Sequence, residues 1–260
     1  MKMAPQGAFY HGLYTMKRIK TLITVVLMGL IIFSASKVYP DLASHSNSEK
    51  ETEIIQRLIE DSSEEERFSR KAWEMLHKEN EDFMGYLMFD SGLIETPVVQ
   101  GKDNDEYLRR SFEGKYDTQG VPFMDSMCSA YSENITIYGH NVYYDSNAKF
   151  SPLEKLTDEK TADDNRTVFF YLEDECREYE VIAVVYITSE EAEDMNYAQP
   201  SFVNMSQKSE WLKFMMEKSL IQAKAQPSPF DKFMTLQTCR KWNDNEHLLV
   251  ICKETGRFRY

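Results

Sequence analysis

Eight short runs rich in β-branched and aromatic residues lie between residues 85 and 254, and each is bounded by turn-forming residues. The runs are GYLMFD, TPVVQG, VPFMD, ITIYGH, TVFFYLED, YEVIAVVYIT, FMTLQTC and HLLVICKE. Most of them follow one another at short spacing, as strands do when they neighbour each other in a sheet. Eight such runs favour a closed, largely β barrel.

Apolar residues at helical spacing occur in two places outside these runs. Residues 53–80 combine such spacing with acidic runs, so we expect two helices, broken near residues 61–63, that form an amphipathic cap. The second place is SQKSEWLKFMMEKSLIQAKA, residues 206–225. A serine at its start and Pro227 beyond its end predict a helix inserted before the cysteine strand FMTLQTC. The expected fold is therefore mainly β with helices.

The N-terminal region has the pattern of a membrane anchor. Lys17, Arg18 and Lys20 precede the uncharged run TLITVVLMGLIIFSAS, which as a helix would cover about 24 Å. Basic residues before the run and acidic residues after it predict a cytoplasmic N-terminus and an external body. The expected segments are a basic cytoplasmic N-terminus (1–20), a transmembrane signal anchor (21–39), a polar linker (40–52) and an extracellular domain (53–260) that includes helices 53–80.

Two alternatives stay open for this region. Residues 34–36, Ser-Ala-Ser, have the small-x-small form of a signal-peptide cleavage site, so a cleaved signal peptide is the alternative to an anchor. Met16 followed by KRIK has the form of a natural start, which makes residues 1–15 a candidate for a mis-called extension.

Charge and cysteine content exclude several classes of protein. The formal net charge of -13 argues against a broad basic surface for nucleic acid. Cys128, Cys176, Cys239 and Cys252 are widely spaced and form no C-x-x-C pair, which argues against a zinc site and against a disulfide scaffold. We therefore expect no metal and no cofactor.

One histidine and one cysteine stand at the ends of β-rich runs. His140 follows the glycine that ends NITIYG, and Cys239 ends FMTLQTC. A thiol has a pKa of about 8.5, so a neighbouring imidazolium favours the thiolate and can later protonate a leaving amine. Two strand ends that each carry half of such a pair suit cysteine acyl transfer, although isolated histidines and cysteines are usually structural.

Several segments together resemble a class B sortase. They are TPVVQGKDNDEYLRRSFEGKYDTQGVPFMD, NITIYGHNV followed by KFSPLEKL, and FMTLQTC, in this order. The resemblance covers roughly residues 53–260, and the N-terminal helices and the helix before the cysteine strand are similar to class B rather than class A.

The resemblance implies a sortase β-barrel anchored by a single span in the membrane of a Gram-positive cell, with the catalytic domain outside. Such cysteine transpeptidases cut the C-terminal sorting signal of surface proteins, typically after threonine, and form an acyl-enzyme thioester. They then pass the acyl group to an amine of a cell-wall precursor or a pilin. No cofactor or nucleic acid takes part.

The resemblance also suggests roles for individual residues. Cys239 matches the family's nucleophile and His140 its general acid/base. Four further positions match residues near the substrate groove. They are Asn104 and Leu108 in the QGKDN region, Tyr197 at a mobile wall, and Thr238 before the nucleophile.

This chain departs from the family pattern at one position. The family has an arginine at the start of the last strand, facing the cysteine, where HLLVICKE places His247. Arginine offers several fixed donors and a permanent charge, whereas histidine offers at most two donors and titrates near neutrality. Arg240 is the competitor for this role, followed by Arg257 and Arg259. The alternative function is therefore a catalytically weak or inactive binding or accessory protein on a sortase fold, and a third is a plain cysteine protease.

Overall fold

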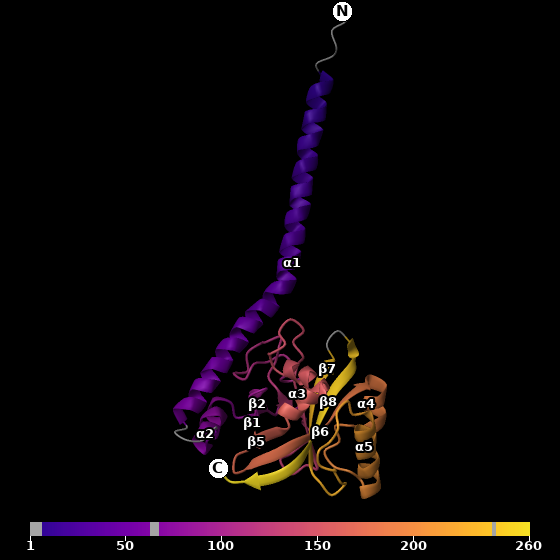
Figure 1. The fold of residues 1–260 in the computed structure, drawn as a ribbon. Helices are drawn as coiled ribbons and strands as arrows, with labels where there is room; N and C mark the ends of the chain where they lie inside the picture. Colours follow the sequence, from indigo (N-terminus) through magenta and orange to yellow (C-terminus); the bar gives the residue numbers. More distant parts are fainter. Residues whose placement is uncertain (1–6, 63–67, 241–242) are drawn as a thin grey trace, which may run out of the picture. The chain divides into compact units, whose positions relative to one another are not determined.

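A computed structural model describes residues 7–62, 68–240 and 243–260 (Figure 1). Contacts divide the chain into two units, residues 1–46 and residues 47–260. The first unit contains most of helix α1 (Gly7–Ser62), which includes the segment predicted as an anchor. Among the helices in the described part of the chain, none combines the length and the apolar character needed to cross a membrane.

The polar segment 40–52, which we expected to be a linker, is helical in the structure, because α1 continues through it. The buried face of α1 explains this difference for the part that belongs to the second unit. Ser48, Glu51, Ile55 and Ile59 are all buried and recur every three or four residues. The expected break near residues 61–63 borders residues 63–67, which lie outside the described residues: α1 is described to Ser62, and α2 (Arg70–Glu79) begins after the Ser69 cap.

The eight predicted strands are confirmed, and they close into a barrel. They are β1 (Phe83–Phe89), β2 (Glu95–Val99), β3 (Phe123–Met124), β4 (Asn134–Tyr138), β5 (Thr167–Tyr171), β6 (Cys176–Thr188), β7 (Phe233–Arg240) and β8 (Asn243–Phe258). Their order around the barrel is β1-β2-β3-β4-β7-β8-β6-β5. Two neighbouring pairs are parallel, β2 with β3 and β4 with β7, and the remaining pairs are antiparallel.

The predicted helix before the cysteine strand is α5 (Met205–Lys218), capped by Asn204 rather than by a serine. Three short helical elements were not predicted: η1 (Ser151–Thr157), α3 (Glu159–Asp164) and α4 (Ser189–Met195). Figure 1 shows α4 and α5 beside the β6–β8 wall of the barrel. Each missed element is only about two turns long, which is too short for a clear helical period.

Strand β7 buries both of its faces. Met234 and Leu236 point into the barrel core, whereas Phe233 packs outward against Trp211 of α5 at a ring distance of 5.3 Å. Residues on a strand alternate between faces, so Thr238 continues the inner row and Cys239 continues the outer row. Cys239, the candidate nucleophile, thus lies on the outer face of β7, beyond the part of that face that α5 covers.

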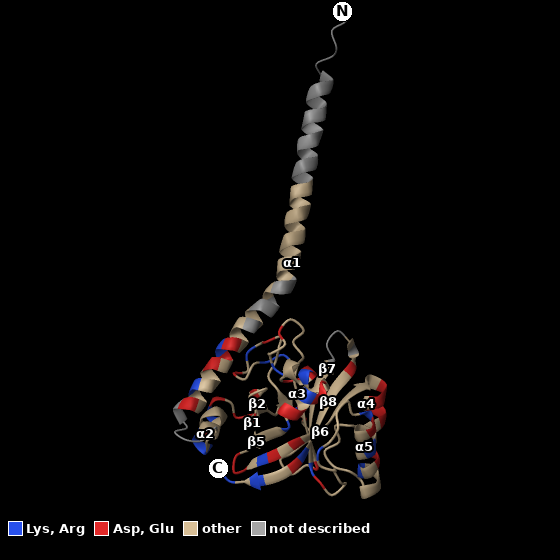
Figure 2. Cartoon of the chain, viewed as in Figure 1, with Lys and Arg blue, Asp and Glu red and all other residues tan. Residues whose placement is uncertain are grey.

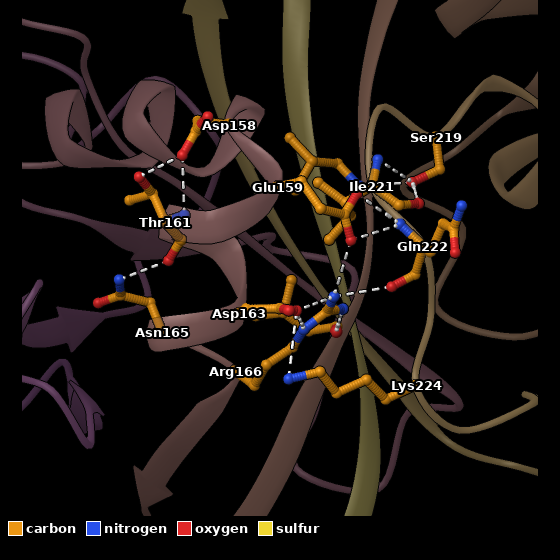
Figure 3. A network of polar contacts seen from close by, with 12 residues as sticks. Asp158, Glu159, Thr161, Asp163, Asn165, Arg166, Ser219, Ile221, Gln222 and Lys224 are labelled. Atoms are coloured by element: carbon orange, nitrogen blue, oxygen red, sulfur yellow. Dashed lines mark hydrogen bonds and ion pairs between the residues drawn. The ribbon is translucent and has the colours of Figure 1, made fainter.

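Arg166 ties the segment before β7 to the rest of the barrel, as Figure 3 shows. Its guanidinium donates to the carbonyls of Val181 (2.9 Å) and Gln222 (2.7 Å) and pairs with Asp163 at 2.7 Å. The backbone N–H of Gln222 in turn donates to Glu159 at 3.0 Å. These contacts satisfy a largely buried cation and hold the chain that leads from α5 into the cysteine strand.

Charges of both signs are spread over the second unit in Figure 2. Red and blue segments alternate along α5 and along the outer ends of β6 and β8. Positive charge is therefore not collected into one broad face in this view, in keeping with the acidic balance of the sequence.

Candidate active site

Cys239 and His140 are brought together by two parallel strands. Strand β4 pairs with β7 with Tyr138 beside Gln237, so continuing that register by two residues sets His140 beside Cys239. Adjacent strands lie about 4.8 Å apart, and parallel neighbours end at the same edge of a sheet. Gly139, between Tyr138 and His140, leaves room for the ring of Phe150, because a Cβ at this position would lie 2.5 Å from that ring.

Both residues line one open pocket of about 240 Å³ at this edge. Cys239 is exposed, and no disulfide involves any of the four cysteines. The pocket is lined by Asn104, Asp105, Leu108, Phe123, Tyr138, Gly139, His140, Gln237 and Cys239. Of the sequence-predicted site residues, the structure therefore brings together Cys239, His140, Asn104 and Leu108.

The imidazole of His140 is held by a backbone carbonyl. Its Nε2 lies 2.8 Å from the carbonyl oxygen of Leu108. A carbonyl can only accept, so Nε2 carries a proton and Nδ1 is the nitrogen that titrates. Burial lowers the pKa of His140 below its usual 6.5, and the positive charges of Arg109 and Lys149 lower it further, whereas the Leu108 carbonyl and Asp117 act in the opposite direction.

The lowered pKa of His140 predicts a pH-dependent stability. Below pH 6.5 the unfolded chain binds this proton more readily than the folded chain, so the free energy of unfolding falls as pH drops from 6.5 through the folded pKa. Burial shifts the pKa of His247 in the same direction. Chemical unfolding at pH values from 7.5 to 5 should therefore show a smaller loss of unfolding free energy for His140→Gln than for wild type. Equal losses in the two proteins would contradict a lowered pKa of His140.

Asp125 organises the polar side of the pocket. Its carboxylate accepts from the Asn104 amide at 2.9 Å and from the Tyr138 hydroxyl at 2.7 Å. Asn104 also accepts from the backbone N–H of Ser126 at 2.8 Å. Asn104 is thus held at both ends of its side chain, with a fixed orientation toward the pocket.

Tyr197 lies close to this group without being part of the pocket lining. Burial raises the pKa of its phenol, a hydrogen bond with Tyr138 lowers it, and the negative charges of Asp125 and Cys239 raise it again. The amide of Asn134 donates to the Tyr197 carbonyl at 3.0 Å, which fixes the backbone of the segment between α4 and α5. Tyr197 therefore lies near Asp125 and Cys239, and its expected place at a mobile wall of the substrate groove stays a prediction.

Thr238 is placed away from the pocket. Its side chain is buried and it pairs with Leu248, a residue of the barrel interior. The expectation that this side chain contacts substrate is therefore not supported by its position. The reason is strand alternation, which turns the residue before Cys239 to the opposite face.

The structure places His247 directly across from Cys239 in the β7–β8 register. Both ring nitrogens already contact other side chains: Nδ1 is 3.0 Å from Nε2 of Gln237, and Nε2 is 3.5 Å from Oγ of Ser189. Arg257 lies ten residues after His247 on β8, opposite Arg177 of β6, which at the rise of a strand is about 33 Å from His247. Arg259 lies two residues further along. These two arginines are therefore remote from the cysteine. The backbone of Arg240 belongs to β7, and its side chain lies outside the described residues.

Sequence reasoning missed a group that holds the peptide unit after the nucleophile. Nδ2 of Asn141 donates to the carbonyl oxygen of Cys239 and to Oε1 of Glu154, each at 3.1 Å. The other oxygen of Glu154 accepts from the Tyr186 hydroxyl at 2.5 Å. The position of Asn141, directly after His140 in GHN, was the only signal in the sequence.

No cluster of three or more His, Cys, Asp or Glu residues suited to a metal ion occurs among the described residues. The arrangement of a thiol and an imidazole in one open pocket is instead the one that covalent acyl transfer uses.

Comparisons with known proteins point to one family. The sortase domain model matches residues 90–255. Sortase B of Staphylococcus aureus is 27% identical over 230 residues, which are 86% of this chain and 91% of that protein. Sortase B of Listeria monocytogenes is 26% identical over 230 residues, with the same shares.

Solved structures agree with this result. A sortase B from B. anthracis in complex with AAEK1 has a TM-score of 0.72 at 26% identity, and the match covers 83% of this chain and 99% of that one. A sortase B–substrate complex from Staphylococcus aureus has a TM-score of 0.71 at 25% identity, and here the match covers 84% and 99%.

Proposed function

The chain belongs to the sortase family, and from this premise we propose that it is a class B cysteine transpeptidase whose nucleophile is Cys239 and whose general acid/base is His140. The observation that carries the proposal is the parallel pairing of β4 with β7, which brings the ends of both strands to one pocket. Its substrates are surface proteins with a C-terminal sorting signal, and its acceptor is an amine of a cell-wall precursor or a pilin.

The reaction begins when His140 Nδ1 takes the thiol proton and the sulfur of Cys239 attacks the carbonyl carbon of the scissile peptide bond. The tetrahedral intermediate collapses as the C–N bond breaks, and the leaving amine receives the proton from His140. A thioester on Cys239 remains. An acceptor amine then attacks this thioester and gives a proton to His140, which returns it to the departing thiolate.

The developing oxyanion needs a donor near Cys239. The backbone N–H of Arg240 belongs to the same rigid peptide unit as the Cys239 carbonyl. Asn141 holds that carbonyl at 3.1 Å, so it also holds the orientation of the N–H. Asn141 therefore acts in this proposal as a positioning residue, and Asn104 and Leu108 provide walls for the bound peptide. Tyr197 supports the Tyr138 side of the pocket through its hydrogen bond with that residue.

A product analysis separates the candidate functions. The full-length chain is incubated with a peptide library that varies the residues around a threonine, with and without an amine acceptor, and the products are identified by mass spectrometry. Transfer to the amine supports the transpeptidase, whereas hydrolysis alone indicates a protease. The absence of any acyl adduct indicates a weak or inactive accessory protein. This alternative is a specific one because His247, not an arginine, lies across from Cys239.

We further propose the topology expected from the sequence: a signal anchor at residues 21–39 and an external catalytic domain. Proteolysis of intact cells should then degrade residues 53–260 and spare the anchor, because only the latter is shielded by lipid. Immunodetection of tags at the two ends measures this. A catalytic domain that resists protease until the cells are lysed would contradict the orientation.

A further inference from the structure

His247, Gln237 and Ser189 form a chain of side-chain contacts beside the nucleophile. Gln237 precedes Cys239 by two residues, so it lies on the same face of β7, and it lines the same pocket. Its amide nitrogen is 3.0 Å from Nδ1 of His247, whose Nε2 is 3.5 Å from Oγ of Ser189. These contacts thus lead from Gln237 in the pocket to Ser189 at the start of α4.

The directions of the hydrogen bonds among these three residues follow from Ser189. The Ser189 hydroxyl donates its proton to the carbonyl oxygen of Asn245 at 3.2 Å, so toward His247 it can only accept. Nε2 of His247 therefore carries the ring proton, and Nδ1 is an acceptor in the neutral ring. Gln237 must then present its NH₂ group to Nδ1, which agrees with the orientation of the amide.

His247 takes one of the two amide protons of Gln237 and keeps the amide plane from rotating. The second N–H and Oε1 remain on the side chain that lines the pocket next to Cys239. A primary amide with one donor and one acceptor in a plane matches the C=O and N–H of a backbone peptide group. An extended peptide whose scissile bond reaches Cys239 would pass this side chain.

We propose that Gln237 is a substrate-contacting residue that hydrogen-bonds the backbone of the bound sorting signal, and that His247 is a positioning residue that acts through Gln237. This inference rests on the proposed function. In this inference His247, at the family's arginine position, does not bind the oxyanion directly. Its ring orients the Gln237 amide, and that amide hydrogen-bonds the peptide. Burial lowers the pKa of His247, which favours the neutral ring that the chain requires.

A double-mutant cycle tests the inference on acylation of the full-length protein by a reactive library peptide. Gln237→Met, which keeps the length and removes both polar groups, should raise KM about tenfold with kcat nearly unchanged. His247→Leu should raise KM about threefold to tenfold. The double variant should be no worse than Gln237→Met, because His247 acts only through Gln237. Gln56→Met, on an exposed part of α1, is the matched control and should behave as wild type.

Two results would overturn the inference. Losses that multiply in the double variant would mean that His247 acts independently of Gln237. A loss confined to kcat in His247→Leu would mean that His247 contacts the reacting atoms itself. A peptide library that acylates no protein at all would instead refute the proposed function.

A second measurement decides the positioning contact without any reaction. Nitrogen-15 NMR of labelled histidine should show His247 protonated at Nε2, with an Nδ1 shift that changes in Gln237→Met. A ring protonated at Nδ1, or a shift insensitive to Gln237, would overturn the contact even in a protein that turns out to be inactive.

Discussion

Cys239→Ala should abolish thioester formation with every sorting-signal peptide. The pocket at the ends of β4 and β7 contains one thiol, and no other lining residue can hold an acyl group through a sulfur atom. The loss should therefore be complete within detection, rather than partial. The measurement is the mass of the intact protein after incubation with peptide. An acyl adduct on the variant would remove Cys239 from the mechanism.

The other cysteines provide the control. Cys128, Cys176 and Cys252 are buried, and burial raises the pKa of each thiol, for Cys176 to about 12. A thiol with a raised pKa is protonated at neutral pH and is a poor nucleophile. Cys128→Ser is the best-matched variant, because the Cys128 sulfur already has polar contacts with the Asn134 carbonyl and the Thr136 N–H, both at 3.5 Å. It should retain wild-type acylation.

His140→Ala should lower turnover by about 10² to 10⁴, the range typical of a general acid/base. Without the imidazole, the thiol proton has no acceptor and the leaving amine has no donor. The effect should appear in kcat and in kcat/KM together, because the proton is transferred in the transition state. Single-turnover kinetics of thioester formation measures the loss.

His140→Gln separates proton transfer from positioning. A glutamine amide can still donate to the Leu108 carbonyl that His140 contacts at 2.8 Å, but it cannot take up a proton. It should therefore be nearly as slow as His140→Ala. A His140→Gln protein with close to full activity would show that the side chain only positions the loop, and that another group transfers the proton.

The barrel and the place of His140 and Cys239 near strand ends could be predicted because their signals are local. Eight strand-like runs with turn residues between them correspond to the eight strands. His140 and Cys239 each end a run, which suggested strand ends. The parallel pairing of β4 with β7 could not be read from composition, because some ninety residues separate the two strands. The family resemblance supplied that link.

The features that the sequence did not reveal depend on tertiary packing. Residues 40–52 are polar enough to suggest a linker, yet Ser48 and Glu51 continue a buried helical face that only the packed structure reveals. Thr238 was assigned by its place in the T-L-x-T-C motif, and strand alternation turns it inward. The contact of His247 with Gln237 joins residues on β8 and β7, and a single sequence contains no signal for such a pair.

In the proposed reaction, Cys239 carries the acyl group of a sorting signal. The most direct measurement is to trap the intermediate of the full-length chain with a reactive library peptide in the absence of an amine, digest the protein, and sequence the modified fragment by tandem mass spectrometry. We expect an acyl group on Cys239 within FMTLQTC that ends at the cleaved residue of the peptide. Hydroxylamine or an acceptor amine should release it. An acyl group on any other residue, or peptide cleavage without a hydroxylamine-sensitive adduct on Cys239, would contradict the proposed reaction.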